Sequence, residues 1–130
     1  MFIETPATSV SKNGQETFDF LIDLANFEKL MPENIAKFEV LDADKFLFAL
    51  KGMPEIVLER KEQVPNSKLV LGAVNDKLPF TLTADISEMN ENTSKVVLSF
   101  QGEFNAMMAM MVKTPIANFM NTLSQNLGKL

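Results

Sequence analysis

Few side chains in this sequence could act as nucleophiles, acids, bases or metal ligands near neutral pH. The chain contains no Cys, His, Trp or Tyr. It therefore cannot form a thiol nucleophile, an imidazole base or the soft-ligand zinc and copper sites that these residues build. Carboxylates remain, but the sequence has no calcium-loop pattern, no HExxH-like helix and no Gly-rich phosphate loop. We expect no metal, no cofactor and no catalytic residue.

The remaining candidates for polar contacts with a ligand are the charged run Glu59–Glu62 and the single residue Glu103. The run Glu59–Glu62 lies in one predicted strand, so its side chains alternate between the two faces of a sheet. A solvated face with cross-strand pairs is the simpler interpretation, whereas an inward Arg60 could anchor a ligand carboxylate or phosphate. Glu103 is the best candidate for an acid in a cavity, but alternation places it opposite Phe100 and Phe104, so only a bulge would turn it inward.

The most unusual stretch is "FNAMMAMMVKTP", residues 104–115, in which four methionines occupy five positions. These are Met107, Met108, Met110 and Met111. At about 100° per residue from Met107, they span roughly −60° to +100° of a helix, whereas the apolar residues from Val112 onward span roughly 120° to 220°. The apolar stripe shifts near Pro115, and Thr114 followed by Pro115 resembles a helix start. The pattern predicts two helical pieces meeting at Thr114–Pro115, or one kinked helix.

The N-terminal third predicts a strand followed by two short helices. Residues 2–11 form the first strand, with Pro6 indicating an edge position or a bulge. Asn13 and Glu16 form a capping-box-like start for a helix over 14–24. A second helical turn over 26–31 is stopped by Pro32, and Asp23 and Asn26 are expected to cap and connect the two.

From about residue 36 to residue 104 the apolar period changes to two. Six segments rich in Val, Ile, Leu, Phe and Thr read as strands: "KFEVL", "KFLFALK", "EIVLERKEQV", "KLVLGAV", "FTLTADISEM" and "KVVLSFQGEF". Short links at 42–44, 52–54, 65–67, 75–77 and 90–93 join them, so they form an antiparallel meander. Gly102 occupies an inward position, which predicts a bulge or a bend.

Length and charge limit the class of protein. The 130 residues suit a single domain over 1–130. The net charge of −5, without clustered basic residues, argues against a nucleic-acid partner. The longest apolar run, Ala106–Val112, is far shorter than the roughly 20 residues that cross a bilayer. Because "MFIETPATSV" lacks the features of a signal peptide, we expect a cytoplasmic location.

This order of elements resembles the START-like superfamily, also called SRPBCC or Bet v 1-like, and is nearest to its polyketide cyclase and coenzyme Q-binding-protein-like branch. The resemblance is carried by "FDFLIDLANFEKLMP" at 18–32, by "EIVLERKEQVPNSKLVL" and by the terminal helix. It implies an α+β helix-grip fold, in which a curved antiparallel seven-stranded sheet wraps on a long C-terminal helix, with two short helices after the first strand. It also implies an apolar cavity between sheet and helix.

Three interpretations of the methionines stay open. They fill the core where the last strand meets the helix, they line a compliant cavity mouth, or they form an interface such as a homodimer contact. Phe27 and Met31 are either core or the opposite side of the same opening. The candidate ligand-binding residues are Phe27, Met31, Phe100, Phe104, Met107, Met108, Met111 and Phe119.

We therefore predict that the protein binds or carries a small hydrophobic ligand such as a lipid, an isoprenoid or a polyketide-like molecule. One alternative is a cyclase- or hydrolase-type enzyme that uses the same cavity, although the lack of His and Tyr leaves few groups that titrate near neutral pH. Another is an interaction module that docks a partner protein through the methionine-rich surface.

Overall fold

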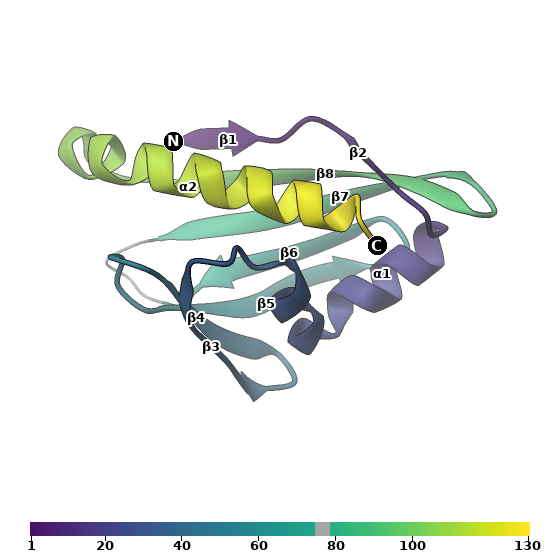
Figure 1. The fold of residues 1–130 in the computed structure, drawn as a ribbon, viewed down its shortest axis with the longest axis horizontal. Helices are drawn as coiled ribbons and strands as arrows, with labels where there is room; N and C mark the ends of the chain where they lie inside the picture. Colours follow the sequence, from purple (N-terminus) through teal and green to yellow (C-terminus); the bar gives the residue numbers. More distant parts are fainter. Residues whose placement is uncertain (75–78) are drawn as a thin grey trace.

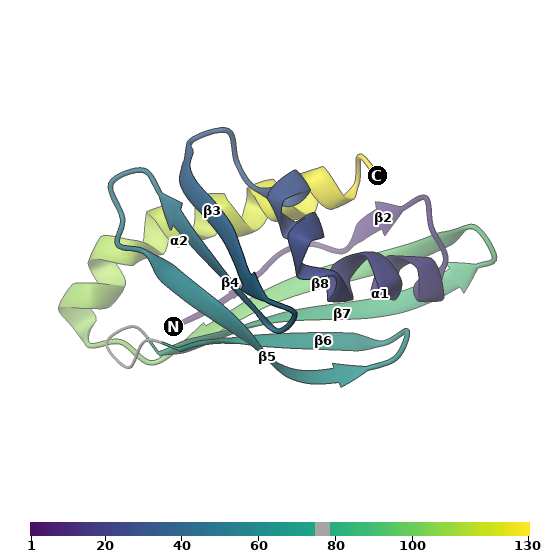
Figure 2. The same cartoon turned by 90° about the horizontal axis from the view of Figure 1, so that it is seen from below.

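A curved antiparallel sheet of eight strands wraps around one long C-terminal helix in the computed structural model, which describes residues 1–74 and 79–130 (Figure 1). The strand order is β1-β8-β7-β6-β5-β4-β3, and β2 also pairs with β8. The helix, α2 (Ala106–Leu127), lies across the concave side of the sheet. The shorter helix α1 (Gly14–Ile22) contacts β6, β7 and β8 (Figure 2). This arrangement confirms the predicted helix-grip fold.

The predicted first strand is two strands, β1 (Phe2–Glu4) and β2 (Thr8–Val10), so the sheet has eight strands instead of seven. Both pair with β8 (Thr93–Gly102). Pro6 lies at the break because it has no N–H to donate to a ladder. Thr5 fills the gap, since its N–H donates to the Leu98 carbonyl at 2.9 Å and its Oγ1 accepts the Leu98 N–H at 3.1 Å.

The helical segment after β2 begins as predicted. Asn13 Oδ1 accepts the Glu16 N–H at 2.9 Å, and Glu16 Oε1 accepts the Asn13 N–H at 3.2 Å, which completes the capping box. Helix α1 ends at Ile22, and the 3₁₀ helix η1 (Leu24–Leu30) follows. Asp23 caps η1 through the Ala25 N–H, and the Asn26 amide donates to the Phe20 carbonyl at 2.9 Å, which confirms the expected capping and connecting roles.

The six predicted strands of the meander are all present. They are β3 (Ile35–Asp42), β4 (Lys45–Leu50), β5 (Ile56–Val64), β6 (Lys68–Ala73), β7 (Phe80–Asn90) and β8. The predicted link at 75–77 lies outside the described residues. No bulge occurs at Gly102, because Gly102 pairs regularly with Phe80 in the curved sheet. A Cβ at Gly102 would instead lie 2.7 Å from the Phe104 ring, so the glycine makes room for that ring.

Helix α2 runs unbroken through Pro115, so the prediction of two helical pieces is wrong. Its N-cap is Asn105, whose Oδ1 accepts the Met108 N–H at 2.8 Å, and not Thr114. A proline inside a helix deprives the carbonyl four residues earlier of its partner. Here that residue is Met111, which is 68% exposed, and the helix continues past Pro115. In the described part of the chain, no helix is long and apolar enough to cross a membrane.

Candidate functional site

Helix α2 presents two different faces, and together they account for the shift in its apolar stripe. The face toward the sheet is buried and consists of Val112, Ile116, Phe119, Met120, Leu123 and Leu127. A second face, at about 20° to 80° from Met107 on a helical wheel, carries Met111, Pro115, Asn118 and Thr122. The apolar stripe seen in the sequence therefore combines residues of the buried face with residues of the face that borders the surface.

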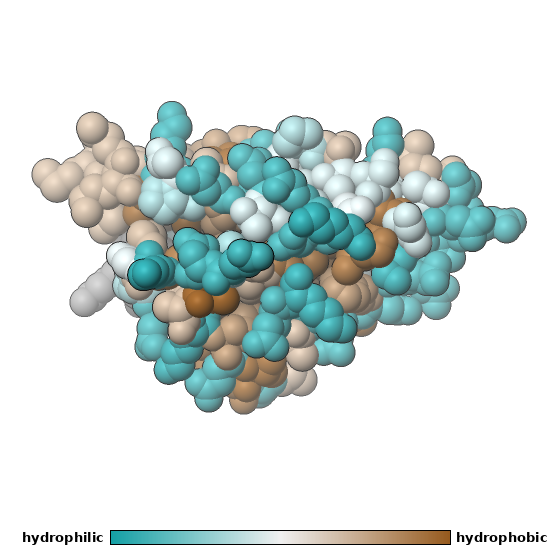
Figure 3. All heavy atoms as spheres, viewed as in Figure 1, coloured by the Kyte–Doolittle hydropathy of each residue, from teal (hydrophilic) through white to brown (hydrophobic). Residues whose placement is uncertain are grey.

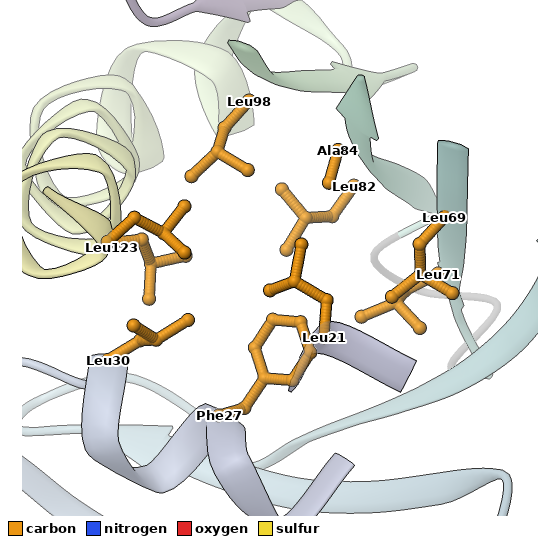
Figure 4. A pocket seen from close by; sticks show the side chains of 10 residues that line it. Leu21, Phe27, Leu30, Leu69, Leu71, Leu82, Ala84, Leu98 and Leu123 are labelled. Atoms are coloured by element: carbon orange, nitrogen blue, oxygen red, sulfur yellow. The ribbon is translucent and has the colours of Figure 1, made fainter. Parts of the chain in front are cut away.

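The space between α2 and the sheet is almost completely filled by side chains. One small cavity of about 10 Å³ lies where η1, α2 and the sheet meet. Figure 4 shows leucines of the helix and the sheet pointing toward one another there, together with Phe27 from η1. A volume of this size holds at most about one water molecule, so this cavity does not accommodate a ligand as it stands.

A second small cavity lies under the first turns of α2, and its volume is also about 10 Å³. Its walls are Met53, Ile56, Phe80, Phe100, Phe104, Val112 and Ile116. The rings of Phe80 and Phe100 stack at 4.7 Å between centroids, and those of Phe100 and Phe104 lie 6.2 Å apart. Aromatic packing therefore closes this end of the interior.

The larger space is a groove of about 400 Å³ on the second face of α2. We call it the α2 groove; its lining residues are Pro32, Asn34, Leu50, Lys51, Gly52, Met53, Met111, Pro115, Asn118, Phe119 and Thr122. The wall opposite α2 comes from the segment after η1 and from the turn between β4 and β5. Phe119 forms part of the groove wall and also stacks on Phe48 of the core, with ring centroids 5.1 Å apart.

The predicted ligand-binding residues lie in several different places. Met111 and Phe119 line the α2 groove. Phe27 lines the first small cavity, while Phe100 and Phe104 line the second. These placements do not bring the predicted set into a single site.

The remaining predicted residues differ strongly in exposure. Met31 is buried, Met108 is half-buried against the core, and Met107 is 75% exposed. Together with Met110 at 82% and Met111 at 68%, Met107 forms an apolar surface at the start of α2. Figure 3 shows the corresponding apolar surface at that end of the molecule. Core filling therefore does not account for these three methionines.

Arg60 is bound to protein groups. Its Nη2 donates to the Ile22 carbonyl at 2.6 Å and to the Ala43 carbonyl at 3.0 Å, and its Nε lies 3.5 Å from an Asp44 carboxylate oxygen. The guanidinium thus ties the end of α1 to the turn between β3 and β4. Glu103 is exposed and follows the last residue of β8. Among the described residues, no group of three or more carboxylates is placed to hold a metal ion.

Two of the predicted residues, Met111 and Phe119, lie on α2's side of the groove, and no predicted residue lies on the opposite wall. Pro32 and Asn34 follow η1, and Leu50 to Met53 form a turn, so these residues are far from α2 in sequence. The only signals for them were Pro32, read as a helix stop, and "GMP", read as a link between strands. Neither signal indicates that the two segments face the same helix.

No family model and no curated protein matches this sequence. Solved structures do match over nearly its whole length. A START superfamily protein from Mycobacterium smegmatis is 11% identical, with a TM-score of 0.77 covering 98% of this chain and 94% of that one. Norcoclaurine synthase from Thalictrum flavum, in complex with dopamine and hydroxybenzaldehyde, is 10% identical, with a TM-score of 0.69 covering 96% of this chain and 84% of that one. The chain therefore has the START-like, Bet v 1-like fold.

Proposed function

We propose that the protein binds a small, mostly hydrophobic molecule between α2 and the turn that joins β4 to β5. The α2 groove carries this proposal, because it has about 400 Å³ of space and is continuous with the apolar core. That volume lies within the usual range of roughly 300 to 1,000 Å³ for small-molecule sites. Phe119 provides the continuity, since the same ring lines the groove and packs on Phe48.

Deeper entry of a ligand requires side chains to move, because each of the two small cavities measures about 10 Å³. Met53 is the residue whose movement would connect the spaces, since it lines both the α2 groove and the second cavity. A methionine side chain adapts readily because it is unbranched and has three rotatable bonds. The ligand thus occupies the groove first and reaches toward Phe100 when Met53 moves aside.

One further observation favours binding over catalysis, and another supports a small-molecule site in general. The buried polar residues among those described are Thr5, Thr17, Ser94 and Ser124, which do not titrate near neutral pH. A reaction in this interior would therefore lack a buried acid or base. The similar fold of norcoclaurine synthase, whose structure holds dopamine and hydroxybenzaldehyde, supports a small-molecule site in this architecture.

Native mass spectrometry of the freshly purified protein tests the proposal, and we expect a co-purified apolar molecule. Titration with an environment-sensitive apolar dye gives a second readout. Met111→Gln should weaken dye binding, because a bound ligand would have to desolvate the new amide. Met110→Gln is the matched control, since Met110 is exposed on the same helical segment but is not part of the groove lining. Absence of any bound molecule, together with equal dye binding by both variants, would contradict the proposal.

A second candidate function is association with another copy of the chain through Met107, Met110 and Met111. The observation that favours it is their exposure of 68–82%, because clustered exposed apolar side chains commonly mark interaction surfaces. Sedimentation of the wild type and of a Met107→Gln, Met110→Gln double variant tests it. A wild-type dimer that becomes monomeric in the variant supports this function, and a wild type that is monomeric at all concentrations contradicts it.

A further inference from the structure

Among the described residues that line the α2 groove, Lys51 alone has an ionisable side chain. The other polar residues in its lining are Asn34, Asn118 and Thr122, which are neutral. The chain as a whole carries a net charge of −5, so a positive charge at an otherwise neutral groove contrasts with the rest of the molecule. A lone cation at a mostly apolar site favours a ligand of opposite charge.

The turn between β4 and β5 fixes the position of Lys51. The Met53 N–H donates to the Leu50 carbonyl at 2.9 Å, and Gly52 has a φ of 83°, a conformation that glycine adopts at little cost. The Lys51 N–H donates to the Asn34 carbonyl at 3.3 Å. These bonds hold the backbone of Lys51 beside Asn34, where both residues line the groove.

The charge of Lys51 is not neutralised by an ion pair within the described residues. The ion pairs found there join Lys37 to Glu55, Arg60 to Asp44, Lys61 to Glu59 and Lys68 to Asp85. Glu55, the acidic residue that follows the turn, is therefore already paired with Lys37, at 3.2 Å. Among the residues that the structure describes, the Lys51 ammonium thus has no carboxylate partner, and a ligand anion could pair with it.

We infer that the α2 groove takes an amphiphile with an apolar body and one carboxylate, and that Lys51 pairs with the carboxylate. This inference rests on the proposed function and names the class of ligand. The apolar body lies against Met53, Met111 and Phe119, and the amides of Asn34 and Asn118 can donate to the carboxylate oxygens. One lysine balances one negative charge, whereas a dianionic phosphate would leave a charge uncompensated.

Competition with a bound apolar dye tests the inference, using three ligands that share a ten-carbon chain: decanoate, decanol and decylamine. We expect the wild type to bind decanoate about tenfold more tightly than decanol, the usual scale for one charge-assisted contact. Lys51→Gln should remove this preference and leave decanol binding unchanged, and Lys51→Glu should favour decylamine. Lys113→Gln, at an exposed residue of α2 outside the groove lining, is the control and should behave as the wild type.

The possible outcomes separate the inference from the proposed function. If all three ligands bind alike and Lys51→Gln changes nothing, the inference is overturned while the proposed function stands. If the protein binds neither the dye nor any of the three ligands, both are overturned. If Lys113→Gln reduces decanoate binding as much as Lys51→Gln does, general electrostatic attraction explains the preference, and the assignment to Lys51 is wrong. Thermal unfolding of each variant at the wild-type temperature shows that the fold is intact.

Discussion

Replacing Leu123 by Ala tests whether α2 and the sheet share one close-packed interior. Leu123 is 1% exposed, and it lines the first small cavity together with Leu98 of β8. The cavity measures about 10 Å³, so the neighbouring side chains already fill almost all of the available space. The substitution removes three carbon atoms from the middle of this contact.

The expected loss of stability has two parts. Removing three carbons forfeits about 2.4 kcal/mol of transfer free energy, at about 0.8 kcal/mol for each carbon. Each 50 Å³ of cavity that the surroundings fail to refill adds about 1.2 kcal/mol. Because Leu123 projects from a long helix onto a sheet, collapse around the gap is limited, and we expect a total of about 3 to 4 kcal/mol.

Equilibrium unfolding in urea, followed by far-ultraviolet circular dichroism, measures this loss. Met110→Ala removes an apolar side chain from the same helix at a residue that is 82% exposed, so it should change the free energy of unfolding by less than about 0.5 kcal/mol. The enlarged cavity of the Leu123 variant should also bind a small apolar molecule such as benzene and regain stability as its concentration rises. A loss below about 1 kcal/mol, or equal losses in the two variants, would refute the described packing.

Three further substitutions test particular contacts. Asn105→Ala removes the N-cap of α2 and should cost about 1 kcal/mol in urea unfolding, whereas Asn105→Ser should retain most of it. Gly102→Ala places a Cβ 2.7 Å from the Phe104 ring and should cost about 1 to 3 kcal/mol, and the additional change Phe104→Ala should make Gly102→Ala nearly neutral if the ring is the cause. Thr5→Val deprives the buried Leu98 N–H of its acceptor, so we expect a loss of about 1 to 3 kcal/mol and faster hydrogen exchange at that amide; unchanged exchange would argue against the bond.

Features that depend on near neighbours could be predicted from the sequence. The capping box joins Asn13 and Glu16, which are three residues apart, so its pattern is visible without knowledge of the fold. The alternation that predicted the six strands of the meander is also local, because it records which side of each strand faces the core. The START-like resemblance then supplied the way in which the sheet wraps around α2.

Features that depend on distant neighbours could not be predicted in the same way. The apolar residues on two faces of α2 look like a broken stripe until the turn at Leu50 to Met53 is known to lie opposite one of these faces. The reason for Gly102 is similarly hidden, because the Phe104 ring folds back over it only when β8 has ended and the chain has turned. Of the predicted site, Met111 and Phe119 lie at the groove, and Lys51 was not singled out because a lysine in a turn usually faces solvent.

The two edges of the sheet differ in their ability to recruit a foreign strand. Along β8, the strand β1 pairs with Ser99 to Gln101, β2 pairs with Ser94 to Val96, and Thr5 satisfies the Leu98 backbone between them. The outermost strands at this edge are β1 and β2, each three residues long and interrupted at Pro6, so they offer only short stretches of backbone to another chain. The opposite edge, β3, ends the strand order and leaves Val40 and Leu41 exposed. Two register shifts in β3 and the charged side chains of Lys37 and Glu39 disfavour intermolecular pairing there, so resistance to aggregation rests on these features of β3.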